Sequence, residues 1–380
     1  MREYLLVFVA AVAVTYLLGV AARELALRFH AVARVRDRDV HAIPIPYFGG
    51  IAMLGGLWAA YLVARHLPFL SLAPDQQVFA PALAVLVGGT CVCIVGVIDD
   101  LFELDALSKF AGQVLSAVIV VAMGVQFLWV PLPGGGMQGI DPIQVIIFTV
   151  FWIVLTANAV NFIDGLDGLA VGVIAIGAAA FFIYAFILAV ENNQPRAIAA
   201  AFLSAALAGA CVGMLPHNFF PARMFIGDSG SMLLGMVLAC SAVTLVGQFP
   251  QTNVSQGIGG AEAGFQAALL PLLLPFAMLL VPLLDLVMAV IRRTRAGRSP
   301  FSPDKMHLHH RLLEIGHSQR RAVLVMYMVA ALVAFGTVIL SLFAGWQSVL
   351  GISTLAVITL TVAFVLPRFG QGSHSGQPTG

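Results

Sequence analysis

Long apolar segments limit what this chain can fold into more than any other feature of its sequence. Eleven of them occur in 380 residues, and each is close to the ~20 residues that a helix needs to cross a bilayer. Only 10% of the residues are charged and the net charge is +1, whereas a typical soluble domain is about 25% charged. An ordinary soluble enzyme, a disordered chain and a nucleic-acid binder that uses bulk positive charge are therefore excluded.

The segments predict an all-α, polytopic membrane protein with about 11 transmembrane helices. Pro271, Pro275 and Pro282 predict a bent or broken ninth helix. Residues 1–367 are expected to form one integral-membrane domain, and the Gly/Ser-rich residues 368–380 a flexible cytoplasmic tail. The segments cover residues 4–28, 48–66, 78–98, 108–129, 143–160, 168–190, 197–215, 230–249, 265–291, 322–344 and 348–366.

Basic residues predict the orientation of these helices. If the N-terminus lies outside, the outer side receives only Arg2, Arg65 and Arg196, and its Gly/Pro-rich stretch 131–136 is expected to be a plain connector. By the positive-inside rule the other side is cytoplasmic, so the N-terminus is outside and the C-terminus inside. The other side receives Arg34, Arg36, Arg38, Arg223, the basic run 292–321 and Arg368.

Polar clusters follow odd-numbered segments, which places all of them at the cytoplasmic face. This arrangement predicts one composite site assembled from cytoplasmic loops far apart in the sequence. The clusters are Asp99 and Asp100 after the third segment, Asp164 and Asp167 after the fifth, Asp228 after the seventh, and His307, His309 and His310 after the ninth.

Asp99 and Asp100 allow two interpretations. Adjacent carboxylates can end one helix and cap the next, or one can hold a hard cation while the other accepts a proton. Lys109 and Gln113 are four residues apart and share one helix face. Lys109 is suited to contact a phosphate, although a membrane-interface anchor explains it equally well.

The next two clusters favour chemistry more strongly. Turn geometry explains the Asp-Gly pairs at Asp164 and Asp167, but it does not explain Asn158 and Asn161 at the end of an apolar segment, where an unpaired amide is costly. Asp228 stands in a small-residue turn, either as a helix cap or as a metal-ligating carboxylate beside glycines that admit a phosphate.

Three histidines lie within four residues at His307, His309 and His310, beside Arg311. They resemble a metal-binding tract, but neighbours in sequence cannot all face one ion on a helix. Histidines beside arginines can instead bind a diphosphate. Asp285 lies inside the ninth segment, where a carboxylate indicates a function or a buried partner.

A site with few carboxylates at a membrane surface suits Mg²⁺ better than zinc or calcium, because Mg²⁺ leaves positions for water and phosphates. Mn²⁺ is the expected substitute. Phosphoryl transfer to a membrane-bound substrate is the chemistry that these residue types favour. A transporter would place its charges near mid-membrane, which only Asp285 suggests. An intramembrane aspartyl protease needs a Gly-x-Gly-Asp motif, which Phe225-Ile226-Gly227-Asp228 lacks.

Four ordered motifs resemble those of the polyprenyl-phosphate N-acetylhexosamine-1-phosphate transferases. They are Val95 to Asp100, Asn158 to Gly168, Gly227 to Ser231, and Pro303 to His310. The His-Leu-His-His form is similar to the WecA/TagO-type group. That resemblance implies transfer of GlcNAc-1-phosphate from UDP-GlcNAc to undecaprenyl or decaprenyl phosphate with release of UMP, at the bacterial cytoplasmic membrane, as the first membrane step of an envelope polysaccharide. Phospho-N-acetylmuramoyl-pentapeptide transferase activity stays open as the sibling alternative.

The resemblance also implies roles for residues. Its expected partners are UDP-GlcNAc, the polyprenyl phosphate and the lipid bilayer, with no nucleic acid; a homodimer is left open. Asp99, Asp100, Asp164 and Asp167 would be catalytic, and Asp228 would ligate Mg²⁺ with Asp99 and Asp100. The substrate-binding residues would be Lys109, Asn158, Asn161, Arg223, His307, His309, His310 and Arg311.

Overall fold

A computed structural model describes most of the chain. The described residues are 1–29, 31–32, 44–72, 77–127, 129–132, 136–139, 141–190, 197–246, 291, 294–295, 297, 318–342 and 346–370. Apart from residue 291, the predicted ninth segment, including Asp285, lies outside this set, and every other predicted segment coincides with a helix. These helices are α1 (Arg2–Arg28), α2 (Gly49–Ala64), α4 (Phe79–Phe102), α5 (Ala106–Ala122), α6 (Pro142–Ile163), α7 (Leu169–Val190), α8 (Ala197–Asn218), α9 (Gly227–Val246), α13 (Gln319–Leu342) and α14 (Trp346–Gly370).

The lengths of these helices confirm the prediction of an all-α, multi-pass membrane protein. In the described part of the chain, 7 helices are long and apolar enough to cross a membrane. The others, α2, α5 and the stretch Trp346–Thr359 of α14, are shorter apolar helices. Since α14 continues to Gly370, the predicted tail begins within its last turn, and residues 371–380 lie outside the described set.

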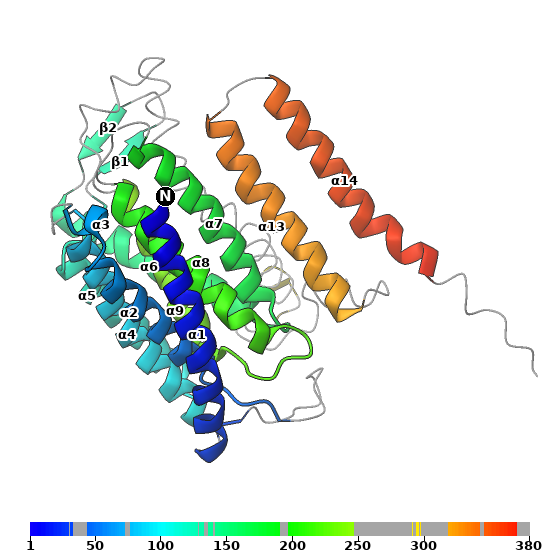
Figure 1. Cartoon of the computed structure of the whole chain (residues 1–380), viewed down its shortest axis with the longest axis horizontal. Coiled ribbons are helices and arrows are strands. Elements are labelled where there is room, and N and C mark those ends of the chain that lie inside the picture. The colour runs from blue at the N-terminus through cyan, green and yellow to red at the C-terminus, as the bar shows by residue number, and fades with distance from the viewer. Residues whose placement is uncertain are drawn as a thin grey trace, which may run out of the picture.

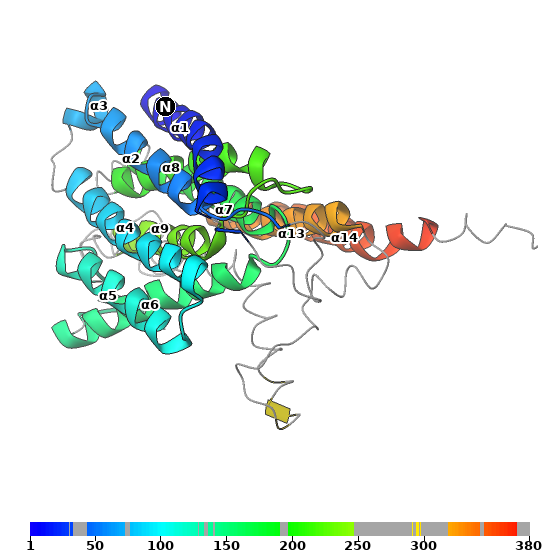
Figure 2. The ribbon, with the colours of Figure 1, turned by 90° about the horizontal axis from the view of Figure 1, so that it is seen from below.

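Helix α9 occupies the centre of the bundle. It packs against α2, α4, α6, α7 and α8, which surround it in Figure 2. Helix α1 lies outside α2 and α8, and α5 lies outside α4 and α6. At the other side α13 packs on α7 and α14 packs on α13, so this pair extends away from the main bundle (Figure 1). The central position of α9 is the one expected for a helix that is apolar on all faces, because every face of it is buried.

Glycines allow α2 and α4 to approach the first turn of α9 closely. A Cβ atom on Gly96 of α4 would overlap the backbone of Ser229, and one on Gly50 of α2 would overlap the backbone of Ser229 and Gly230. Close backbone contact through small residues is the usual way in which helices associate in a membrane. The start of α9 is therefore held tightly between two neighbouring helices.

Both ends of the stretch predicted as a plain connector belong to strands of a β-hairpin. Strand β1 (Trp129–Leu132) pairs antiparallel with β2 (Gly136–Gly139), so that Trp129 lies opposite Gly139. The prediction was wrong here because Pro and Gly mark turns without revealing whether the flanking residues pair. The hairpin lies at the same end of the bundle as the N-terminus and the short helix α3 (Pro68–Leu72) (Figure 1).

At the opposite end, helices run beyond the apolar segments. Helix α4 continues to Phe102, α6 continues to Ile163, and α9 begins at Gly227. Asp99, Asp100 and Asp228 thus stand on terminal helical turns, which corrects their expected location on loops, and Asn161 stands at the end of a helix as expected. Hydropathy detects only the apolar part of a helix, whereas the hydrogen-bonded turns continue into the polar residues.

Candidate active site

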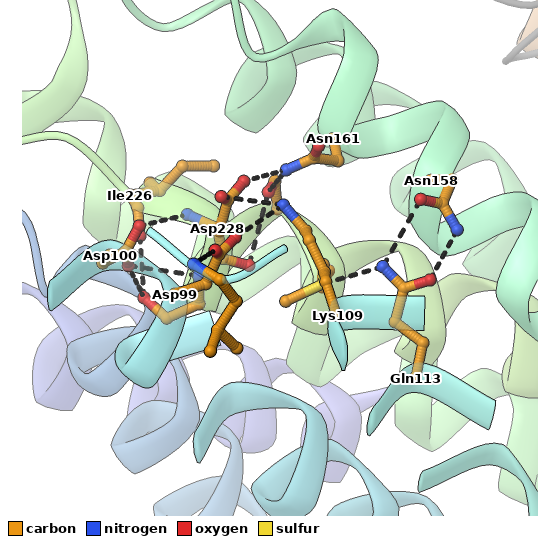
Figure 3. Close-up of polar contacts among 12 residues, drawn as sticks. Asp99, Asp100, Lys109, Gln113, Asn158, Asn161, Ile226 and Asp228 are labelled. Atoms are coloured by element: carbon orange, nitrogen blue, oxygen red, sulfur yellow. Dashed lines mark hydrogen bonds and ion pairs between the residues drawn. The ribbon is translucent and has the colours of Figure 1, made fainter. Parts of the chain in front are cut away.

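Lys109 and two aspartates form the centre of the candidate site. The Lys109 Nζ atom, from the first turn of α5, lies 2.8 Å from Asp99 Oδ2 on α4 and 2.8 Å from Asp228 Oδ2 on α9 (Figure 3). The exposed fractions of these side chains are 19% for Lys109, 8% for Asp99 and 32% for Asp228. Three helices therefore contribute charges to one partly buried cluster, as the common face of their motifs predicts.

Asn161 completes the surroundings of Asp228. Its Nδ2 atom donates to Asp228 Oδ1 and, at 2.8 Å, to Ser231 Oγ one turn further along α9. Asp228 lies in the first turn of α9, where the positive end of the helix dipole stabilises negative charge. The helix dipole, Asn161 and Lys109 together hold this carboxylate ionised and oriented.

Asp99 and Lys109 are positioned by the turn that links α4 to α5. Asp99 Oδ1 accepts a hydrogen bond of 2.8 Å from the backbone N–H of Leu104. Asp105 then caps α5, because its carboxylate accepts the backbone N–H groups of Leu107 and Ser108, each at 3.1 Å. This cap fixes where α5 begins and hence where Lys109 points.

Asp100 faces away from Lys109 and caps α9. Its carboxylate accepts the backbone N–H groups of Asp228 at 2.8 Å and Ser229 at 3.3 Å, and the Ser229 hydroxyl at 2.9 Å. A cap for a helix was one of the two sequence interpretations, but the capped helix is α9 and not the next one along the chain. The adjacent aspartates thus point to different partners.

Asp164 and Asp167 lie in the turn between α6 and α7. Burial of Asp164, together with the negative charges of Asp228, Asp100 and Asp167, raises the pKa of its carboxyl well above the usual range. Asp167 Oδ2 accepts the backbone N–H of Ala222 at 2.9 Å. Asp167 therefore anchors the segment that leads to Asp228, while burial and the neighbouring carboxylates favour the neutral form of Asp164.

Two further contacts secure the same turn. Asn218 at the end of α8 accepts the N–H of Gly168 at 3.1 Å through its Oδ1 atom, and its Nδ2 atom donates to the Met224 carbonyl at 3.1 Å. The Tyr327 hydroxyl of α13 donates to the Gly168 carbonyl. Asn218 was not among the predicted site residues, although it is a polar residue at the end of an apolar segment.

Asn158 pairs with Gln113 one turn away from the cluster. Asn158 Nδ2 donates to Gln113 Oε1 at 2.6 Å and to the Val154 carbonyl at 2.8 Å, and Gln113 Nε2 donates to Asn158 Oδ1 at 3.4 Å (Figure 3). Gln113 is buried, and it was not among the predicted site residues. Its spacing of four residues from Lys109, which places both on one face of α5, is the sequence feature that could have identified it.

The remaining predicted residues are not brought into the cluster by the described structure. Arg223 is exposed, and its carbonyl accepts a hydrogen bond of 3.3 Å from Arg23 Nε of α1. The other predicted substrate-binding residues lie outside the described residues; these are His307, His309, His310 and Arg311.

The donor set of the cluster fits Mg²⁺. One carboxylate oxygen of Asp99 and one of Asp228 lie on either side of the Lys109 ammonium, each 2.8 Å from it. Mg²⁺ usually takes one or two carboxylates, while phosphates and water supply its other ligands. Among the described residues, no group of three His, Cys, Asp or Glu side chains forms a complete metal cage.

Comparison with known proteins agrees with the geometry. Residues 82–246, which span α4 to α9 and hold the whole cluster, match glycosyl transferase family 4. The decaprenyl-phosphate N-acetylglucosaminephosphotransferase of Mycolicibacterium smegmatis is 44% identical over 379 residues, which cover 98% of this chain and 91% of the relative. The corresponding protein of Mycobacterium tuberculosis is 43% identical over 381 residues, covering 100% of this chain and 92% of the relative.

A more distant relative carries the name of another activity. The phospho-N-acetylmuramoyl-pentapeptide-transferase of Desulforudis audaxviator is 32% identical over 345 residues, covering 84% of this chain and 93% of the relative. Both kinds of relative align over most of their length. The chain therefore belongs to glycosyl transferase family 4, with the polyprenyl-phosphate N-acetylhexosamine-1-phosphate transferases.

Proposed function

We propose that this protein transfers GlcNAc-1-phosphate from UDP-GlcNAc to a polyprenyl phosphate, decaprenyl or undecaprenyl, and releases UMP. An oxygen of the lipid phosphate forms a bond to the β-phosphorus of UDP-GlcNAc. The bond from that phosphorus to the oxygen that bridges the α-phosphorus breaks, and UMP leaves with this oxygen. The Lys109, Asp99 and Asp228 cluster carries the proposal, because it joins carboxylates and an ammonium at one end of a membrane bundle.

Each residue of the cluster has a task in this reaction. Lys109 binds a phosphate oxygen and opposes its negative charge. Asp228 and Asp99 would hold Mg²⁺, which when bound neutralises charge on the phosphates. Asp99 also accepts a proton from the lipid phosphate if that group arrives protonated. Asn161 orients Asp228, and the start of α9 adds the positive end of its dipole where the phosphates meet.

The protein is proposed to act in the bacterial cytoplasmic membrane with this site facing the cytoplasm, where the nucleotide sugar is available. A UDP-GlcNAc donor is favoured because the relatives at 43–44% identity are named N-acetylglucosaminephosphotransferases, whereas the pentapeptide transferase is 32% identical. Family membership leaves no support for the transporter or the aspartyl protease. The product would enter an envelope polysaccharide.

Purified protein with decaprenyl or undecaprenyl phosphate and Mg²⁺ tests the proposal. UDP-GlcNAc is expected to give UMP and a lipid-linked GlcNAc diphosphate, both detected by mass spectrometry. UDP-MurNAc-pentapeptide in a parallel reaction is expected to give neither. UMP from the pentapeptide donor alone would assign the sibling activity, and no UMP from either donor would contradict a transferase.

A further inference from the structure

We infer that Gln113 and Asn158 form a positioning pair that sets the register of α5 against α6 and thereby places Lys109 in the site. The inference rests on the proposed function for its kinetic test. Neither amide contacts the cluster directly. Gln113 lies one helical turn after Lys109 on α5, and Asn158 lies one turn before Asn161 on α6 (Figure 3).

Apart from the ion pairs of Lys109 itself, this pair supplies the directional contact of α5 with its neighbouring helices. Helix α5 packs against α4 and α6 at the outside of the bundle. In the described part of the chain, Lys109 and Gln113 are the α5 side chains that bond to another helix, whereas the Ser116 hydroxyl donates to Gly112 of α5 itself. Apolar contacts alone let a helix slide or rotate, because they have little directional preference.

The two amides largely satisfy each other, which fixes their relative position. Asn158 Nδ2 has two acceptors, Gln113 Oε1 at 2.6 Å and the Val154 carbonyl at 2.8 Å. Gln113 Nε2 also lies 3.0 Å from Met232 Sδ, one turn beyond Asp228 on α9. A shift of α5 would leave the buried amide of Gln113 and the half-buried amide of Asn158 without partners, which is costly in an apolar interior.

The lengths of the two side chains provide the test. Gln113→Asn shortens one partner and Asn158→Gln lengthens the other, whereas the double variant restores the combined length with every amide retained. Each single variant is expected to lower kcat by about 10- to 100-fold, with KM for UDP-GlcNAc within about twofold, because a misplacement of about 1 Å can cost about 100-fold. The double variant is expected to recover to within about threefold of the wild type.

A second readout does not depend on turnover. Lys109 and Lys305 are the only lysines in the sequence, so reductive methylation followed by mass spectrometry can compare their reactivities within one sample. Lys109, held between two carboxylates, is expected to react slowly in the wild type and the double variant, and several-fold faster in each single variant. Ser116→Ala is the matched control, a buried α5 residue with no bond to another helix, and is expected to change neither readout.

The outcomes separate the two proposals. The positioning role would be overturned if both single variants kept the Lys109 reactivity and the turnover of the wild type. It would also be overturned if the double variant showed no recovery, in either readout, over the single variant with the lower turnover. A wild-type protein that releases no UMP, but shows the expected pattern of Lys109 reactivity, would contradict the proposed function and keep the positioning role.

Discussion

At the scale of single residues, Asp228 is the carboxylate that both Lys109 and Asn161 contact. Lys109, Asn161 and the first turn of α9 all stabilise its charge. Asp228→Asn keeps the size of the side chain and an oxygen for Asn161, but removes the charge. We expect UMP release to fall by at least about 100-fold, the scale of losing one electrostatic group from a transition state, with an unchanged unfolding midpoint.

A matched change at the same end of the bundle controls for this variant. Asp105→Asn makes the same chemical substitution on an exposed residue that caps α5, and Asn is an equally good cap. It is expected to retain wild-type turnover. Near-normal activity of Asp228→Asn would show that the reaction does not need the charge of Asp228.

Asp99 and Asp100 are neighbours with separable effects. Asp100→Ala would leave the backbone N–H groups of Asp228 and Ser229 without their acceptor, so we expect a loss of about 1–3 kcal/mol in the free energy of unfolding as well as lower turnover. Asp99→Asn should lower turnover with a smaller effect on stability. Thermal unfolding of both variants checks this, and an unchanged midpoint for Asp100→Ala would exclude its capping role.

At the scale of helices, the contact between α4 and α9 allows no side chain at Gly96. Gly96→Ala would push the backbones apart and move Asp228 away from Lys109. We expect turnover to fall at least about 10-fold, because small misplacements of reacting groups are costly, and stability to fall by about 1–3 kcal/mol through overpacking.

The matched control lies on α14. A Cβ atom on Gly351 would meet nothing within 4 Å, so Gly351→Ala should be neutral or slightly stabilising, since Ala is the better helix former. Equal effects of the two substitutions would show that helix propensity, and not the contact with Ser229, decides the outcome at Gly96.

Hydropathy predicted the helices well because crossing a bilayer requires a local property, a run of apolar residues. It also predicted that Asp99, Asn161 and Asp228 gather at one end, since chain direction alternates from helix to helix. It did not predict that Asp100 caps α9 or that Asn158 pairs with Gln113. Those contacts depend on how each helix is rotated against its neighbours, which packing of many side chains decides.

At the scale of the whole molecule, the bundle has two different ends. The hairpin, α3 and the N-terminus lie at one end, and the candidate site lies at the other (Figure 1). Basic residues predict that the site end is cytoplasmic. Alkaline phosphatase fused after residue 66 should be active, and a green fluorescent protein fused after residue 104 should fluoresce; the reverse pattern in both fusions would place the site outside the cell.

The packing of α9 also determines how slowly this helix opens. Its neighbours cover it on every side, whereas α14 packs mainly on α13 at the edge (Figure 2). Local opening costs most where contacts are dense, so the amide protons of α9 should be among the last to exchange with deuterated solvent. Asp228 would then stand on one of the most slowly opening helices of the protein, while exchange becomes faster toward the periphery.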